Sequence, residues 1–177
     1  MDITIRLAEM DDVPALKELI PLSARELSKG YYTSEQTESM IKYIIGVDTQ
    51  LIIDQTYYVA EADGQIVGCG GWSKRKTLYG GDQIKEQEDP LLDPKVDAGH
   101  IRAFFVHPQW TRKGIGRRII LACEAAARAE GFTRMDLGAT LPGEPLYAAL
   151  GYVVTERFEI PTPDGISIPA AQMQKQL

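Results

Sequence analysis

The stretch Ile101–Arg118, IRAFFVHPQWTRKGIGRR, decides the fold of this chain. Its first six residues are mainly apolar or aromatic, which is typical of a buried strand, and His107-Pro108 ends that run. A basic turn with two glycines follows, and a helical pattern begins at once. Strand, glycine-bearing turn and helix in this order predict a site that holds a phosphate group.

The turn has the chemistry that anion binding requires. Gly114 and Gly116 allow the main chain to approach a ligand closely, and the first N–H groups of the helix point at it. The helix dipole favours negative charge at the same place, and Arg112, Lys113 and Arg117 add full positive charges. The sequence therefore predicts a phosphorylated ligand bound near its middle.

The glycine pair has other interpretations. A dinucleotide-binding fingerprint would need a third glycine where Ile119 stands, a place in the opening βαβ unit and an acid after the next strand, and the motif meets none of these conditions. The sequence contains no Walker A pattern. The remaining alternative is a helix-start loop without a ligand, since short motifs of this kind often occur by chance.

Chain length, composition and net charge limit the class of protein. The chain has 177 residues, enough for one domain, which we expect over residues 1–177, and 44% hydrophobic residues are ordinary for a globular protein. A net charge of −6 argues against general nucleic-acid binding. Cys69 and Cys123 stand among small residues, which indicates buried positions, and beside two histidines they are too few for a structural zinc site. We expect no metal.

Targeting signals are also missing from the sequence. No run of about 18 apolar residues is present, as a membrane-spanning helix would need. The N-terminal MDITIRLAEMDD has neither the basic nor the apolar region of a signal peptide. We therefore expect a cytoplasmic protein without membrane contacts.

Residue patterns predict helices and strands on both sides of the central stretch. Pro21 is expected to kink or interrupt the first helix, with a capping box at Ser23 to restart it. Asp63-Gly64 predicts the tight turn of a hairpin, and 76–99 predicts a long loop. The expected strands are 3–7, 57–61, 65–72, 101–106, 135–137, 152–160 and 166–173. The expected helices begin near Asp11 or Asp12, at Ser23, at Thr33, after the glycine turn and at Glu144.

The whole chain resembles the GCN5-related N-acetyltransferase (GNAT) family. FFVHPQWTRKGIGRR, residues 104–118, is similar to that family's acetyl-coenzyme A motif, and LYAALGY, residues 146–152, is similar to its C-terminal motif. The resemblance implies a single mixed α/β (α+β) domain with a mostly antiparallel central sheet, one splayed strand pair and helices on both faces. One departure is Thr111, where the family pattern begins with Gln or Arg. Because main-chain N–H groups make most of the contacts, we expect binding to be retained.

The resemblance implies acetyl-coenzyme A as cosubstrate. Its pantetheine arm would pair as an added strand with the main chain of Phe104, Phe105 and Val106. The neighbouring strand at 135–137 must then splay away after a bulge, while the side chains of Ile101, Phe104 and Phe105 are expected in the core. The N–H groups that would hold the pyrophosphate belong to Arg112, Lys113, Gly114, Ile115, Gly116 and Arg117.

The implied reaction is transfer of an acetyl group to a primary amine of a small molecule or a protein, by direct attack through a tetrahedral intermediate. Tyr147 lies at the tyrosine position of the C-terminal motif and is the expected acid for the departing thiolate; the alternative is a core tyrosine on an amphipathic helix. The N–H of Phe105 or Val106 is the expected oxyanion donor. The general base is not identified, and the candidates that sequence location alone suggests are Asp97, His100 and Glu35.

The acceptor is expected between the early helices and the hairpin. Aromatic rings with nearby acids would suit a small cationic amine, although rings of this kind also serve simply to cover a core. The aromatic residues are Tyr31, Tyr32, Trp72 and Tyr79, and the acids are Glu35, Glu38 and Glu61.

Other functions on the same scaffold stay open. One is a non-catalytic acyl-coenzyme A sensor or partner-binding domain, and another is O-acetylation or transfer of a longer acyl chain. Family relatives are often dimers, so the closing hairpin is a candidate edge for pairing in a homodimer.

Overall fold

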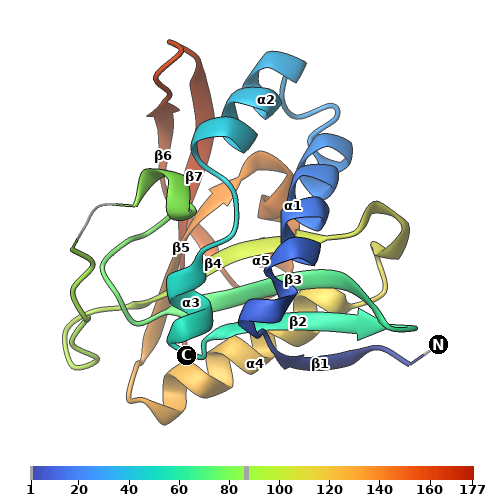
Figure 1. The fold of residues 1–177 in the computed structure, drawn as a ribbon. Coiled ribbons are helices and arrows are strands. Elements are labelled where there is room, and N and C mark those ends of the chain that lie inside the picture. The colour runs from blue at the N-terminus through green and yellow to red at the C-terminus, as the bar shows by residue number, and fades with distance from the viewer. Residues whose placement is uncertain (1, 86–87) are drawn as a thin grey trace.

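The computed structural model describes residues 2–85 and 88–177 (Figure 1). Residue 1 and residues 86–87, the latter within the loop expected at 76–99, lie outside the described part. Seven strands form one sheet in the order β1-β2-β3-β4-β5-β7-β6. All neighbours pair antiparallel except β4 and β5. The strands are β1 (Thr4–Leu7), β2 (Tyr57–Ala62), β3 (Gln65–Ser73), β4 (Gly99–Val106), β5 (Arg134–Thr140), β6 (Val153–Pro161) and β7 (Ser167–Gln176).

Helices cover both faces of this sheet, which confirms the expected fold class. The apolar side of α1 packs with Val59 and Cys69, whereas α4 packs with Ala60 and Val67. Since Val59 and Ala60 are consecutive on β2, their side chains point to opposite faces. The helices are α1 (Val13–Leu27), α2 (Ser34–Tyr43), α3 (Thr49–Ile53), α4 (Ile115–Ala129) and α5 (Glu144–Ala149).

The β6–β7 hairpin forms a third core region with α2, which stands beside it in Figure 1. Met40 and Ile44 of α2 pack with Ile160 and Ile168 of the hairpin. The predicted capping box at the start of α2 is confirmed, because the Thr33 hydroxyl accepts from the Gln36 N–H at 3.1 Å. This capping fixes where α2 begins, beside the hairpin.

The two central strands diverge. β4 pairs with β5 only at Gly99–Met135 and His100–Asp136, and beyond these residues β5 continues alongside β7 alone. The register between β3 and β4 shifts next to Gly71, and Ala103 has φ 56° there. This bulge turns the end of β4 away from β5. The expected splayed pair is confirmed, although β5 is longer than the predicted 135–137.

One expectation about the helices is wrong and one helix was not predicted. Pro21 does not interrupt the first helix, and no new helix begins at Ser23, because α1 runs unbroken from Val13 to Leu27 with both residues inside it. A proline inside a helix costs about 3 kcal/mol, and burial of Leu16, Leu19, Ile20 and Ala24 on one side of α1 offsets that cost. The five-residue helix α3 was not predicted, since its only local signal is Asp48, whose side chain accepts from the Gln50 N–H.

Candidate functional site

The glycine turn exposes a row of main-chain donors at the start of α4. Gly114 is the N-cap in the left-handed conformation at φ 78°, and Arg112 also has a positive φ of 61°. Within the described residues, the N–H groups from Arg112 to Arg117 form no hydrogen bond. The next residue, Arg118, makes the first bond of the helix ladder, from its N–H to the Gly114 carbonyl at 3.0 Å. The turn therefore presents free donors to an anion.

Gly116 joins this turn to the second motif of the sequence. A Cβ on Gly116 would lie 2.7 Å from Leu146 Cδ2, so the missing side chain lets α5 pack directly against the first turn of α4. Leu146 packs against the same core cluster as Ile115 and Ile119. The two sequence motifs thus lie together, next to the free N–H groups.

Two joined pockets open where β4 and β5 diverge. The proximal pocket lies at the end of β4, between Val106, Leu146, Gly143 and the α1 residues Ser23 and Leu27. The distal pocket lies deeper along β4, beside Arg102, and reaches the loop at 78–81 and the β6–β7 hairpin. Residues shared by both pockets mark their junction, and these are Met40, Ile45, Phe104, Phe105, Thr140 and Tyr147.

The bulge on β4 shapes this junction. The Phe104 ring lies directly over Gly70, because a Cβ on Gly70 would stand 2.7 Å from three of its ring carbons. The Tyr57 hydroxyl donates to the Ala103 carbonyl at 2.7 Å and holds the bulge from within the core. Phe104 and Phe105 pack against the core clusters, as expected, and both residues also line the two pockets.

Tyr147 lies at the junction, as its place in the C-terminal motif indicates. Its side chain is 8% exposed, and its ring meets the Phe104 ring edge to face with centroids 6.3 Å apart. Burial raises the pKa of Tyr147 above the usual value for tyrosine, so its hydroxyl stays protonated near neutral pH. No acceptor or donor among residues 2–85 and 88–177 bonds this hydroxyl, which leaves it available to a ligand.

One of the two expected oxyanion donors, the Val106 N–H, is less open than the sequence indicates. The Val106 N–H donates to the Ser23 hydroxyl at 3.2 Å, so it already has a partner. Ser23 was expected to cap a restarted helix; instead it lies inside α1, 2% exposed, and its hydroxyl reaches β4. Serine in this position resembles a helix cap locally, and only the packing of α1 on the sheet reveals its contact.

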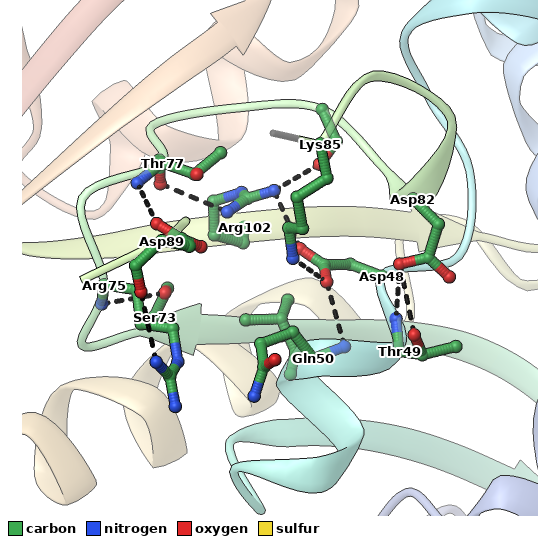
Figure 2. A network of polar contacts seen from close by, with 12 residues as sticks. Asp48, Thr49, Gln50, Ser73, Arg75, Thr77, Asp82, Lys85, Asp89 and Arg102 are labelled. Atoms are coloured by element: carbon green, nitrogen blue, oxygen red, sulfur yellow. Dashed lines mark hydrogen bonds and ion pairs between the residues drawn. The ribbon is translucent and has the colours of Figure 1, made fainter. Parts of the chain in front are cut away.

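A buried ion-pair network (Figure 2) adjoins the distal pocket through Arg102, which lines it. The Asp48 carboxylate lies between the Arg102 guanidinium, at 2.9 Å, and the Lys85 ammonium. Arg102 also donates to the carbonyls of Thr77, at 3.1 Å, and Gly80. Asp48 and Arg102 are 0% and 3% exposed. The network therefore ties the pocket wall at 78–81 to β4 and α3. Sequence reasoning missed both residues, which stand 54 positions apart.

Part of the aromatic surface expected for the acceptor is found at the distal pocket. Tyr32 and Tyr79 line it. Trp72 does not, because it is 1% exposed in the core and packs edge to face on Phe132 at 5.7 Å, so the expectation for Trp72 is wrong. Tyr31 is exposed at the surface and lines neither pocket.

The carboxylates expected beside these rings lie elsewhere. Glu38 is bound to Arg25 at 2.7 Å, Glu61 is bound to Arg6 at 2.9 Å, and Glu35 is exposed. None of the three lines the described part of either pocket. The expected pairing of tyrosines with acids around a cationic amine is therefore not formed.

The three residues considered as base also lie outside both pockets. Asp97 accepts from the Asp93 N–H at 2.7 Å and Glu35 is exposed. His100 is buried, and its Nδ1 donates to the Thr77 carbonyl at 3.0 Å. Burial lowers the pKa of His100. The location of these residues in the sequence was a poor guide, because the splay brings other parts of the chain to the junction.

The structure adds two findings on metals and membranes. Among the described residues, no group of three or more His, Cys, Asp or Glu side chains is placed to hold a metal ion. In the same part of the chain, no helix is both long and apolar enough to cross a bilayer.

Solved structures share this fold along the whole chain. A GCN5-related N-acetyltransferase from Rhodopseudomonas palustris has a TM-score of 0.75 at 20% identity, covering 100% of this chain and 97% of that chain. PaiA N-acetyltransferase from Thermoplasma acidophilum, in complex with coenzyme A, has a TM-score of 0.62 at 19% identity, with 100% of both chains covered. YncA from Salmonella typhimurium, with its cofactor acetyl-CoA, has a TM-score of 0.65 at 18% identity, covering 100% and 95%.

The sequence comparison agrees with the fold. No curated protein matches the chain. Residues 18–152, more than half of the chain, match the model of the acetyltransferase (GNAT) family, and this range includes the glycine turn, the splayed strands and Tyr147. The chain belongs to the acetyltransferase (GNAT) family.

Proposed function

We propose that this protein is an acetyl-coenzyme A-dependent N-acetyltransferase that acetylates a primary amine by direct attack. One observation carries the proposal: a helix start with free N–H groups adjoins a pocket between two strands that pair over only two residues. Family membership and the coenzyme-bound relatives support acetyl-coenzyme A as the cosubstrate. When bound, this molecule supplies an activated thioester.

The residues present fit such a cosubstrate. The N–H groups from Arg112 to Arg117 would hold the pyrophosphate, with the side chains of Arg112, Lys113 and Arg117 adding positive charge. The main chain of Phe104, Phe105 and Val106 would face the pantetheine arm, because β5 leaves that edge of β4 after His100. The proximal pocket is lined by Leu146, which packs on Gly116 of the turn, and by Tyr147, so the arm would lie in this pocket.

Tyr147 would act on the departing thiolate. Its hydroxyl has a raised pKa, and a coenzyme A thiol has an ordinary pKa near ~8.5. Full proton transfer from tyrosine to thiolate is therefore uphill, and a hydrogen bond that stabilises the forming negative charge is the more effective contribution. Both pockets are lined by Tyr147, which supports a position where it would contact the reacting atoms from the cosubstrate side and from the acceptor side.

The experiment that tests this proposal combines a thiol-release assay with calorimetry. The parent protein should bind coenzyme A and release thiol from acetyl-coenzyme A when an amine is present. Tyr147→Phe should lower turnover about tenfold or more, as expected for the loss of one hydrogen bond made in the transition state, with coenzyme A affinity retained.

The matched control is Tyr152→Phe. The Tyr152 ring adjoins Tyr147 at 6.1 Å, but Tyr152 lines neither pocket. Its buried hydroxyl has no hydrogen-bond partner among the described residues. This variant should turn over at the parent rate. Equal rates for parent and Tyr147→Phe would refute the role of the hydroxyl, and tight binding without thiol release by any amine would identify an acyl-coenzyme A sensor instead.

A further inference from the structure

We infer that the distal pocket selects an amine attached to an apolar group, an arylalkyl or branched alkyl primary amine, and rejects polyamines. The inference rests on the proposed function and names its acceptor class. The proximal pocket is lined by Leu146, which packs on Gly116 of the glycine turn, and by the junction residues Phe104 and Tyr147. The distal pocket shares these junction residues and extends beside Arg102. An acceptor therefore enters the distal pocket with its amine at the junction.

Apolar side chains form most of the distal wall. Met40 and Ile44 of α2 face Ile160 and Ile168 of the hairpin across a shared cluster. Tyr79 and Phe158 add a pair of rings with centroids 6.0 Å apart. The Tyr79 ring packs beside Gly138 on β5, where a Cβ would lie 3.5 Å from the ring, an ordinary van der Waals distance. The cavity itself has a volume of about 90 Å³, several times what a single water needs.

Two polar side chains that line the distal pocket, Arg102 and Tyr32, are already bound by the protein. Arg102 is the only charged residue among the described lining residues. Its guanidinium is bound to Asp48 and to the carbonyls of Thr77 and Gly80 (Figure 2). The Tyr32 hydroxyl donates to the Pro169 carbonyl and accepts from the Leu141 N–H at 2.9 Å. The hydroxyls of Tyr79, Thr140 and Tyr147 also line the pocket, and none of them supplies a negative charge for an ammonium group.

A second ammonium on the acceptor would be unfavourable. No carboxylate lines the described part of the distal pocket, and Arg102 places a like charge at its end. Burying an ammonium without a partner is strongly unfavourable, whereas burying a methylene group is favourable. The pocket thus distinguishes acceptors by the end remote from the reacting amine.

A series of amines tests this assignment on the intact protein. With acetyl-coenzyme A, n-alkylamines of increasing length should show kcat/KM rising about fourfold per added methylene until the pocket is filled, from ~0.8 kcal/mol per buried CH₂. Phenethylamine should exceed the short alkylamines. The decisive pair is n-pentylamine and putrescine, in which an ammonium replaces the terminal methyl. We expect n-pentylamine to be preferred at least tenfold.

Variants on β6 check that the preference arises in this pocket. Phe158→Glu places a carboxylate in the lining and should shift the n-pentylamine to putrescine ratio toward putrescine by tenfold or more. Val153→Glu adds the same charge on the same strand at a residue that is 62% exposed and lines neither pocket, so the ratio should not change. Phe158→Ala is the second variant and should lower kcat/KM for phenethylamine, while calorimetry with coenzyme A reports that each variant is folded.

The possible results distinguish failure of the acceptor class from failure of the proposed acetyltransferase function. Thiol release that favours putrescine over n-pentylamine overturns the acceptor class and leaves the acetyltransferase proposal standing. An unchanged ratio in Phe158→Glu, with coenzyme A binding intact, also overturns the assignment of the distal pocket. Coenzyme A binding without thiol release from any amine overturns the proposed function and, with it, the acceptor class.

Discussion

Asp48→Asn tests the buried ion pair that holds the wall of the distal pocket. The Asp48 carboxylate is bound by Arg102 at 2.9 Å, by Lys85 and by the Gln50 N–H at 3.1 Å. Asparagine has nearly the same shape and keeps an oxygen for the Gln50 N–H, so the cap of α3 is retained and the negative charge is lost. Arg102, 3% exposed, then stays charged in the interior with only main-chain carbonyls as partners.

The expected loss is large because the remaining charge stays desolvated. Removing one partner of a buried ion pair costs about 3–5 kcal/mol. Lys85 adds little, since its side chain is 14% exposed and reaches water when released. For a chain of this size, the loss corresponds to a decrease in Tm of roughly 6–20 °C.

A second consequence concerns the pocket wall. Arg102 binds the carbonyls of Thr77 and Gly80 only while the network keeps it in place. We therefore expect the KM for the amine to rise in Asp48→Asn. The affinity for coenzyme A should not change, because the glycine turn shares no residue with the network.

Denaturant unfolding measures the first effect, and steady-state kinetics with calorimetry measure the second. The matched control is Glu38→Gln, which breaks an ion pair of similar length, 2.7 Å to Arg25, between two largely exposed side chains. Its unfolding midpoint should equal that of the parent. The free energy of unfolding of Asp48→Asn could instead lie within about 1 kcal/mol of the parent value, as is typical for surface pairs. That result would show that the Arg102–Asp48 pair is not desolvated and would refute this prediction.

Three further changes probe other parts of the molecule. Gly70→Ala should push the Phe104 ring into the junction, because the new Cβ would stand 2.7 Å from its carbons; denaturation should show a loss of ~1–3 kcal/mol, and adding Phe104→Leu should restore both stability and turnover. In Gly114→Ala the added Cβ would have no atom within 4 Å, but alanine would have to adopt φ 78°. We expect the free energy of unfolding to fall by ~1–2 kcal/mol and calorimetry to show a weaker affinity for coenzyme A. An unchanged affinity would contradict the role of the turn. Burial, together with the nearby Arg102 charge, lowers the pKa of His100, although the Thr77 carbonyl, Asp136 and Asp89 act in the opposite direction. The unfolded chain therefore binds the proton more readily, and the free energy of unfolding should fall as pH decreases below ~6.5. His100→Asn should flatten that slope between about pH 5 and 7, and identical slopes would show that His100 does not contribute.

Much of the fold could be predicted because its signals are local. The Asp63-Gly64 turn, the Thr33 capping box and the strand–turn–helix unit at 101–118 each depend on neighbours within a few residues, and the structure contains all three. The Pro21 expectation failed for the opposite reason. The local cost of that proline is real, but burial of one side of α1 against a sheet formed by distant residues outweighs it.

The candidate site likewise has one part that follows from local sequence and another that depends on tertiary packing. The sequence alone determined the glycine turn and the motif that contains Tyr147, because both depend on backbone conformation and residue order within one segment. Only the tertiary structure decided what surrounds them: the Ser23 hydroxyl on the Val106 N–H, the Arg102–Asp48 pair, and an apolar distal pocket in place of a carboxylate-lined one. These contacts join residues far apart in the chain, and their energies arise from burial and charge pairing that exist only once the sheet and helices are packed.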